Sequence, residues 1–173
     1  MPADDQGQLT GRYALIPRTL IFLTCGDQIL LLKGDPHKRL WANSYNGIGG
    51  HIERGEDVLS AAHRELLEET GLSLPSLWIC GVITIDTNKE LGVSLYVLRG
   101  ECTKSLWVNK GKPRTEEGSL EWVSVSNIQV LPLVEDLPIL LPRVIAMQPG
   151  DPPFSAHYSY GEGGGLRMSF YDN

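Results

Sequence analysis

The sequence has few cysteines, no long hydrophobic run and fewer positive than negative charges. Its three cysteines are odd in number, lack CxxC spacing and lie in or beside apolar segments, at Cys25, Cys80 and Cys102. We therefore expect buried free thiols rather than disulfides, redox centres or thiolate metal sites. No apolar stretch reaches the roughly 18 residues that a membrane-spanning helix needs, so no membrane partner is expected.

The charge balance excludes another class of partner. Lys and Arg number 15 against 21 Asp and Glu, and the net charge of −6 argues against a general nucleic-acid-binding surface. The first ten residues are mostly polar and carry Asp4 and Asp5, with no signal pattern, so a cytoplasmic protein is expected. A chain of 173 residues that is 42% hydrophobic fits one domain, 1–173, with 1–17 as an N-terminal arm.

Alternating β-rich runs and one apolar helix account for most of the remaining chain. Gly26 and Asp27 separate two such runs and predict a hairpin. The helix is expected over 137–147, where prolines near the start suit the first turn. Segment 34–46 and the polar segment 107–118 are expected to be loops. The expected strands are 18–25, 28–33, 77–86, 93–100, 120–125, 154–160 and 166–171.

The segment GHIERGEDVLSAAHRELLEETGL, residues 50–72, contains the most informative pattern. A helix is predicted over 58–70, where Asp57 can cap the first amides and Gly71 suits the left-handed position after the last turn. The apolar face that should dock on the core consists of Val58, Leu59, Ala62 and Leu66.

Three glutamates form a stripe beside that apolar face. Glu65, Glu68 and Glu69 fall within an arc of roughly 100° on the helix, where they repel one another unless a cation lies between them. Oxygen ligands without Cys or His favour Mg²⁺ or Mn²⁺ over zinc, and these ions commonly also bind substrate phosphates. The stripe therefore predicts a metal-phosphate site, whereas an ordinary solvated helix face would not need the glycines upstream.

The spacing of Gly50, Glu56, Arg64-Glu65-Leu66, Glu68-Glu69 and Gly71-Leu72 resembles a complete Nudix box. The resemblance implies an α+β fold, an α/β/α sandwich with a mixed sheet, in which the box forms a loop-helix-loop. It also implies hydrolysis of a nucleoside diphosphate linked to another group. By position, the metal ligands would be Glu65, Glu68, Glu69 and the Gly49 carbonyl. Arg64 and Glu56 would form an ion pair, and Glu65 could activate water.

A weaker resemblance concerns the substrate. Thr19, Tyr45-Asn46-Gly47, Trp122 and the final hairpin are similar to features of 8-oxo-dGTP diphosphatases of the MutT-like branch. The resemblance implies that Asn46 and a late acidic residue, for which Asp136 is the candidate, hydrogen-bond the base. Leu133 and Val134 stand where a stacking tryptophan is expected. Further candidates for contacting the substrate are Thr19, Gly49, Gly50, His51 and Trp122.

Several alternatives remain open. The chain could instead hydrolyse ADP-ribose, a dinucleoside polyphosphate or another conjugate, or could be a nucleotide-sensing module without turnover. Glu116 and Glu117 are candidates for an additional ligand or a base, with two solvated loop acids as the alternative. The predicted partner is a small nucleotide rather than nucleic acid, and both a monomer and a homodimer are compatible with the sequence.

Overall fold

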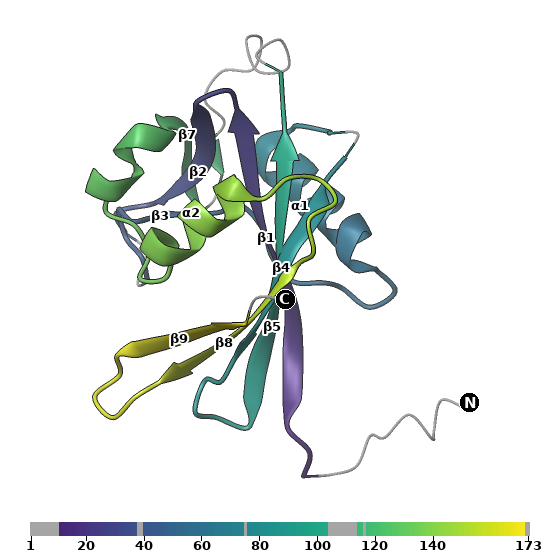
Figure 1. Cartoon of the computed structure of the whole chain (residues 1–173), viewed down its shortest axis with the longest axis vertical. Coiled ribbons are helices and arrows are strands. Elements are labelled where there is room, and N and C mark those ends of the chain that lie inside the picture. The colour runs from purple at the N-terminus through teal and green to yellow at the C-terminus, as the bar shows by residue number, and fades with distance from the viewer. Residues whose placement is uncertain (1–10, 38–39, 75, 104–113, 116, 172–173) are drawn as a thin grey trace.

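One mixed β-sheet forms the centre of the molecule (Figure 1). The computed structural model describes residues 11–37, 40–74, 76–103, 114–115 and 117–171. Within these ranges nine strands form the sheet in the order β6-β7-β2-β1-β5-β4-β8-β9, with β3 paired to β2. The pairs β1–β5 and β4–β8 are parallel and the other pairs are antiparallel.

The strands agree closely with the alternating segments of the sequence. Their bounds are β1 Ala14–Cys25, β2 Gln28–Gly34, β3 Tyr45–Asn46, β4 Trp78–Ile85, β5 Leu91–Glu101, β6 Arg114–Thr115, β7 Gly118–Ser124, β8 Phe154–Tyr160 and β9 Leu166–Tyr171. The predicted hairpins β1–β2 and β8–β9 are both present. Most of the predicted loop 107–118 lies outside the described residues, but its end contributes β6.

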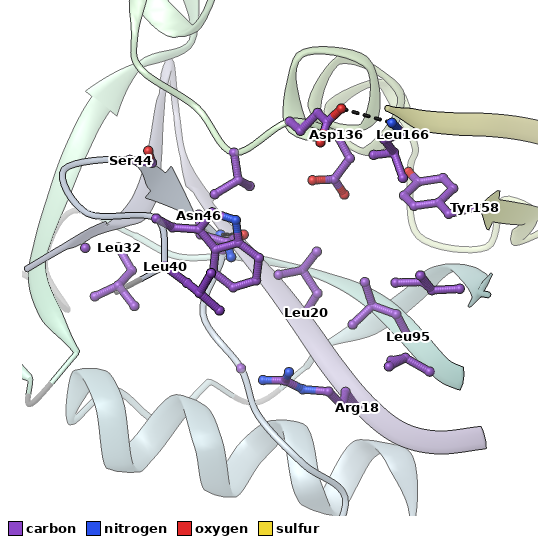
Figure 2. A pocket seen from close by; sticks show the side chains of 18 of the residues that line it. Arg18, Leu20, Leu32, Leu40, Ser44, Asn46, Leu95, Asp136, Tyr158 and Leu166 are labelled. Atoms are coloured by element: carbon purple, nitrogen blue, oxygen red, sulfur yellow. Dashed lines mark hydrogen bonds between the residues drawn. The ribbon is translucent and has the colours of Figure 1, made fainter. Parts of the chain in front are cut away.

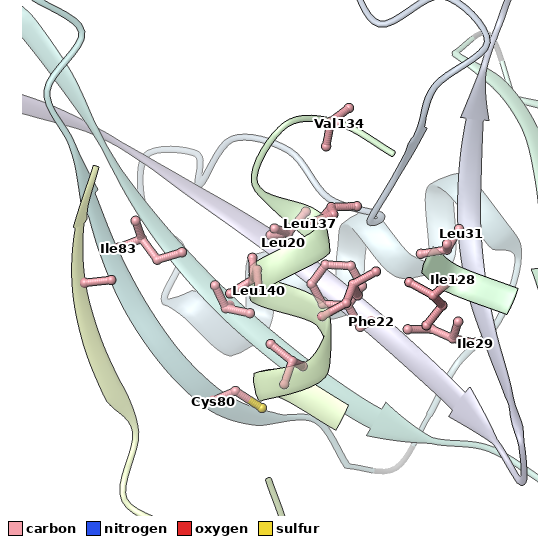
Figure 3. Close-up of a cluster of buried hydrophobic side chains, with 14 of the residues drawn as sticks. Leu20, Phe22, Ile29, Leu31, Cys80, Ile83, Ile128, Val134, Leu137 and Leu140 are labelled. Atoms are coloured by element: carbon pink, nitrogen blue, oxygen red, sulfur yellow. The ribbon is translucent and has the colours of Figure 1, made fainter. Parts of the chain in front are cut away.

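Helices cover both faces of the sheet. The helix α1 (Val58–Thr70) lies on one face, and α2 (Leu137–Ala146) lies on the other with the 3₁₀ turn η3 (Val125–Val130) (Figure 1). Alternate residues of β1 enter the two cores, because side chains along a strand point to opposite faces. Leu20 and Phe22 pack beneath α2 (Figure 3), whereas Ile21 and Leu23 pack with α1. The predicted α/β/α sandwich is thus observed.

The predicted ends of α1 are confirmed, and one residue of its predicted apolar face is not. The Asp57 carboxylate accepts from the amides of Leu59 and Ser60, and Gly71 ends the helix with φ 67°. Leu59, in the first turn, is 41% exposed, whereas Ala61 is fully buried. The small side chains of Ala61 and Ala62 let this turn approach the sheet, which places Leu59 at the edge of the contact.

Part of the predicted N-terminal arm belongs to the sheet. Ala14–Pro17, which we expected within the arm, begin β1 and pair in parallel with Leu91–Ser94 of β5. Residues 1–10 lie outside the described ranges. All three cysteines are buried and free, as predicted. In the described part of the chain, no helix is both long enough and apolar enough to cross a membrane.

A buried arginine attaches α2 to the sheet. Arg99 of β5 donates hydrogen bonds to the carbonyls of Ile145 and Met147, at 2.7 and 2.5 Å, where α2 ends. Its other terminal nitrogen donates to Thr24 Oγ1 and to the exposed carboxylate of Glu101. The guanidinium thus satisfies carbonyls that a helix end leaves without intrahelical donors.

Replacing this arginine should destabilise the fold. We expect Arg99→Met to lower the free energy of unfolding by about 2 to 4 kcal/mol, because the mutation leaves two part-buried carbonyls and the buried Thr24 hydroxyl without their donor. Urea denaturation measures the loss. The matched change Glu101→Gln removes only an exposed ion pair and should cost less than about 1 kcal/mol. Equal effects of the two changes would contradict this role of Arg99.

Candidate active site on helix α1 and the adjoining pocket

Arg64 connects α1 to the loop that precedes it. Its guanidinium donates to both oxygens of Glu56, at 2.7 and 2.9 Å, and to the carbonyl of His51 at 3.0 Å. Glu56 in turn accepts from the amide of Glu53. This bidentate ion pair is the geometry in which arginine binds a carboxylate most specifically. The predicted Arg64–Glu56 pair therefore exists and fixes the loop against the helix.

The same guanidinium contacts two of the three glutamates of the stripe. Nη1 of Arg64 lies 2.8 Å from Glu65 Oε1 and 3.1 Å from Glu68 Oε2. Hydrogen bonds from Arg64, followed by the one from the Glu53 amide, lower the pKa of Glu56 to about 2. Hydrogen bonds to Glu56 and then Glu65 raise the pKa of Arg64. Arg64 and Glu56 thus each stabilise the charged form of the other.

Two glycines allow the preceding loop to pass very close to β1 and α1. Gly49 has φ 141°, and a β-carbon there would collide with the carbonyl oxygen of Thr19. A β-carbon on Gly50 would lie 2.5 Å from Glu65 Oε1. Thr19 holds the loop in place, because its amide donates to the Gly50 carbonyl at 2.8 Å and its hydroxyl accepts from the Gly50 amide. The loop backbone therefore lies directly against the Glu65 carboxylate.

The glutamate stripe has the chemistry of a site for a hard divalent cation. The side chain of Glu65 is only 13% exposed, Glu69 is half-buried with its Oε2 buried, and Glu68 is 59% exposed. Among the described residues, no three acidic, histidine or cysteine side chains are gathered closely enough to enclose a metal ion. Arg64 instead holds Glu65 and Glu68 by their oxygens. The donor set fits Mg²⁺ or Mn²⁺, and binding would require these carboxylates to turn from Arg64 toward the ion.

A cavity of about 590 Å³ opens beside the glycine loop (Figure 2). Its walls are mainly apolar, with a few polar groups between them, as in most small-molecule sites. Asp136 and Tyr158 lie at one end of the view in Figure 2 and Arg18 at the other. Its lining includes Arg18, Thr19, Trp41, Asn46, Gly49, Glu117, Val134, Glu135, Asp136, Tyr158 and Leu166.

Two polar residues predicted to contact a base line this cavity. The side-chain oxygen of Asn46 accepts from the Gly47 amide at 2.8 Å, so its NH₂ group is the part that can donate to a ligand. Asp136 precedes α2, and burial raises the pKa of its carboxyl above the ordinary value. The pocket therefore presents an amide donor and a carboxylate.

The other predicted site residues are distributed differently. Thr19, Gly49 and Glu117 line the cavity, but the backbone of Gly50 and the exposed His51 lie on the loop toward α1. Trp122 does not line the cavity and packs against the core under α1. Glu116 lies outside the described residues.

Two pocket residues were not anticipated from the sequence. Arg18 was assigned only to a strand, although its pairing with His51 brings it beside the glycine loop. Tyr158 belongs to the inward-facing set of β8 with Phe154 and Ala156, so strand alternation alone could have placed it inside. Neither belongs to a local motif.

Comparisons with known proteins agree with this geometry. A model of the NUDIX domain matches residues 15–144. The chain belongs to the Nudix family. It is 32% identical over 112 residues to the uncharacterized Nudix hydrolase YvcI of Bacillus subtilis, which covers 64% of this chain and 67% of that protein. The mutator MutT protein of Bacillus halodurans shares the Nudix fold, with a TM-score of 0.72, 21% identity, and coverage of 90% of this chain and 97% of that one.

A further relative has a named activity. Over 68 residues the chain is 37% identical to the oxidized purine nucleoside triphosphate hydrolase of Mus musculus. This match covers 39% of the chain and 42% of the mouse enzyme. The chain thus spans less than half the length of that relative.

The Glu56–Arg64 pair of this Nudix box should make the fold sensitive to acid. The pKa of Glu56 is about 2 in the folded protein, against an ordinary value of 4.5, so the pair contributes its full stability above pH 4.5. That contribution is lost as the pH falls from about 4.5 toward 2. In EDTA-containing buffer, Glu56→Gln should lower the melting temperature at neutral pH, and its difference from wild type should shrink across this window.

Glu53→Gln is the control, since it removes a neighbouring exposed carboxylate and leaves the pair intact. Its melting temperature should follow the wild-type curve. A difference between Glu56→Gln and wild type that stays constant down to pH 2 would show that the pair does not stabilise the fold by charge.

Proposed function

We propose that this protein is a Mg²⁺-dependent pyrophosphohydrolase of a nucleoside triphosphate, with an oxidised purine nucleotide such as 8-oxo-dGTP as the candidate substrate. Mn²⁺ is the alternative cofactor. The observation that carries the proposal is the glycine loop, because Gly49 lines the pocket of about 590 Å³ and the Gly50 backbone lies against the Glu65 side chain. A nucleotide bound in the pocket would therefore reach the carboxylates with its phosphates.

The ends of the pocket suit the two ends of a nucleotide. Arg18 pairs along the backbone with His51 beside the box, where a positive charge would attract phosphates. At the other end, Asn46 would donate to a base carbonyl and Asp136 would bind a ring N–H. The exposed Trp41 ring lines the same pocket and is the candidate for stacking, in place of the tryptophan missing at Leu133 and Val134.

The chemistry would be attack of water on the α- or β-phosphorus of the triphosphate, with cleavage of the α–β phosphoanhydride bond. Glu68 and Glu69, with Glu65 and the Gly49 carbonyl, would hold the cation. A bound divalent cation polarises phosphate oxygens and lowers the pKa of its water. Glu65 is the candidate to accept the proton of the attacking water, with Glu117 as a second candidate at the pocket wall. The products are a nucleoside monophosphate and pyrophosphate.

A panel of nucleotides tests the proposal. Products are separated by anion-exchange chromatography after incubation with 8-oxo-dGTP, the four dNTPs, ADP-ribose and diadenosine polyphosphates, with Mg²⁺ and with EDTA, so that nucleotides, ribose phosphate and pyrophosphate are all detected. We expect Mg²⁺-dependent pyrophosphate release from a nucleoside triphosphate. Turnover of ADP-ribose or a dinucleoside polyphosphate alone would instead assign the conjugate-hydrolase alternative. Binding without any turnover would assign the nucleotide-sensing alternative.

The stripe itself is tested by one substitution. Glu69→Gln should reduce kcat by about two orders of magnitude or more, because it removes a charged cation ligand from a half-buried position. Its melting temperature should stay near that of wild type. Glu90→Gln changes an exposed glutamate in the β4–β5 turn and should leave kcat unchanged. Near-normal turnover by Glu69→Gln would rule out this metal site.

A further inference from the structure

Tyr158 has a buried hydroxyl whose hydrogen-bonding capacity the described protein residues leave unused. The residue is 2% exposed, and its ring packs edge-on against Phe170 with centroids 6.0 Å apart. Within the described part of the chain its hydroxyl oxygen is buried and has no hydrogen-bond partner. Phenylalanine would fill the same apolar space without this desolvation cost, so the hydroxyl does not serve packing.

The hydroxyl lies at the end of the pocket that also contains Asp136. Tyr158 and Asp136 both line the cavity and are shown close to each other in Figure 2. The segment that carries Asp136 is joined to the C-terminal hairpin, because the Leu166 amide donates to the Glu135 carboxylate at 3.1 Å, drawn as the dashed line. This bond links the segment before α2 to β9, which is paired with the strand that carries Tyr158.

The neighbouring carboxylate determines what the hydroxyl can offer to a ligand. Burial, and secondly the negative charge of Asp136, raise the pKa of Tyr158, so the phenol stays protonated. The field of a carboxylate orients the O–H dipole with its proton toward the negative charge. The lone pairs of the phenol oxygen are then available to a ligand, and Tyr158 and Asp136 act as two neighbouring acceptors.

We propose that Tyr158 is a specificity-determining residue that accepts a hydrogen bond from the exocyclic amine of a guanine-type base while Asp136 accepts from the adjacent ring N–H. Tyr158 is more deeply buried than Asp136. The exocyclic amine projects from the purine ring, so the amine, rather than the ring N–H, would reach the Tyr158 hydroxyl. Adenine presents an acceptor at that ring position, and hypoxanthine lacks the amine. This assignment rests on the proposed nucleotide function of the pocket.

The test compares two nucleotides that differ only in the 2-amino group. Above neutral pH, wild type should hydrolyse dGTP with a kcat/KM about 5- to 50-fold higher than dITP, the range expected for one or two buried hydrogen bonds. In Tyr158→Phe this ratio should fall toward one, mainly by loss of activity on dGTP. Tyr171→Phe removes the hydroxyl of an exposed tyrosine on β9 that does not line the pocket, and should keep the wild-type ratio.

A binding measurement separates this inference from the proposed hydrolysis. Calorimetric dissociation constants of dGMP and dIMP, measured without metal, should show the same preference and the same loss in Tyr158→Phe. If no nucleotide is hydrolysed but this pattern is found, the pocket assignment stands and the proposed activity fails. If Tyr158→Phe folds as wild type, by its melting temperature, and keeps the wild-type ratio in both assays, the assignment of Tyr158 is overturned. A wild-type protein that does not distinguish the two nucleotides overturns it as well.

Discussion

The close approach of the Gly49–Gly50 backbone to helix α1 is the constraint on which the rest of the site depends. Glycine is required at position 49, because its φ is 141° and a β-carbon there would strike the backbone carbonyl oxygen of Thr19. A β-carbon on Gly50 would meet the Glu65 carboxylate, which would have to turn away. Arg64 fixes the other end of the same loop through Glu56 and the His51 carbonyl. The glutamates of a stripe on an isolated helix would only repel one another, whereas here Arg64 contacts Glu65 and Glu68, and the Gly50 backbone lies against the Glu65 carboxylate.

The order of strands in the sheet places the proposed substrate pocket next to the glycine loop. Parallel pairing of β1 with β5 and of β4 with β8 brings the C-terminal hairpin to the pocket that the glycine loop borders. Charge then differs along the pocket, with Arg18 toward the Nudix box and Asp136 toward the hairpin. A nucleotide is complementary to this arrangement, because it has anionic phosphates at one end and a neutral hydrogen-bonding base at the other. The proposed orientation of substrate follows from this match.

How much the sequence could predict depended on whether the determinants were local. Local features were predictable because each follows from residues close together in the sequence. These features are the bounds and caps of α1, the hairpins and the Arg64–Glu56 pair. Strand alternation could have placed Tyr158 inside, but that Tyr158 and Arg18 line one pocket was not predictable, since it depends on strand order across the sheet. Trp122 shows the same limit, because β7 is paired with β2 so that its indole packs beneath α1 rather than in the pocket.

We infer that carboxylates of α1 and the adjacent glycine loop together hold a divalent cation where phosphates can reach it. Anomalous diffraction from crystals grown with Mn²⁺ locates such an ion. We expect a manganese peak bounded by Glu65, Glu68, Glu69 and the backbone of Gly49. A peak at another place on the protein, or none at a Mn²⁺ concentration that supports turnover, would show that these residues do not form the cation site.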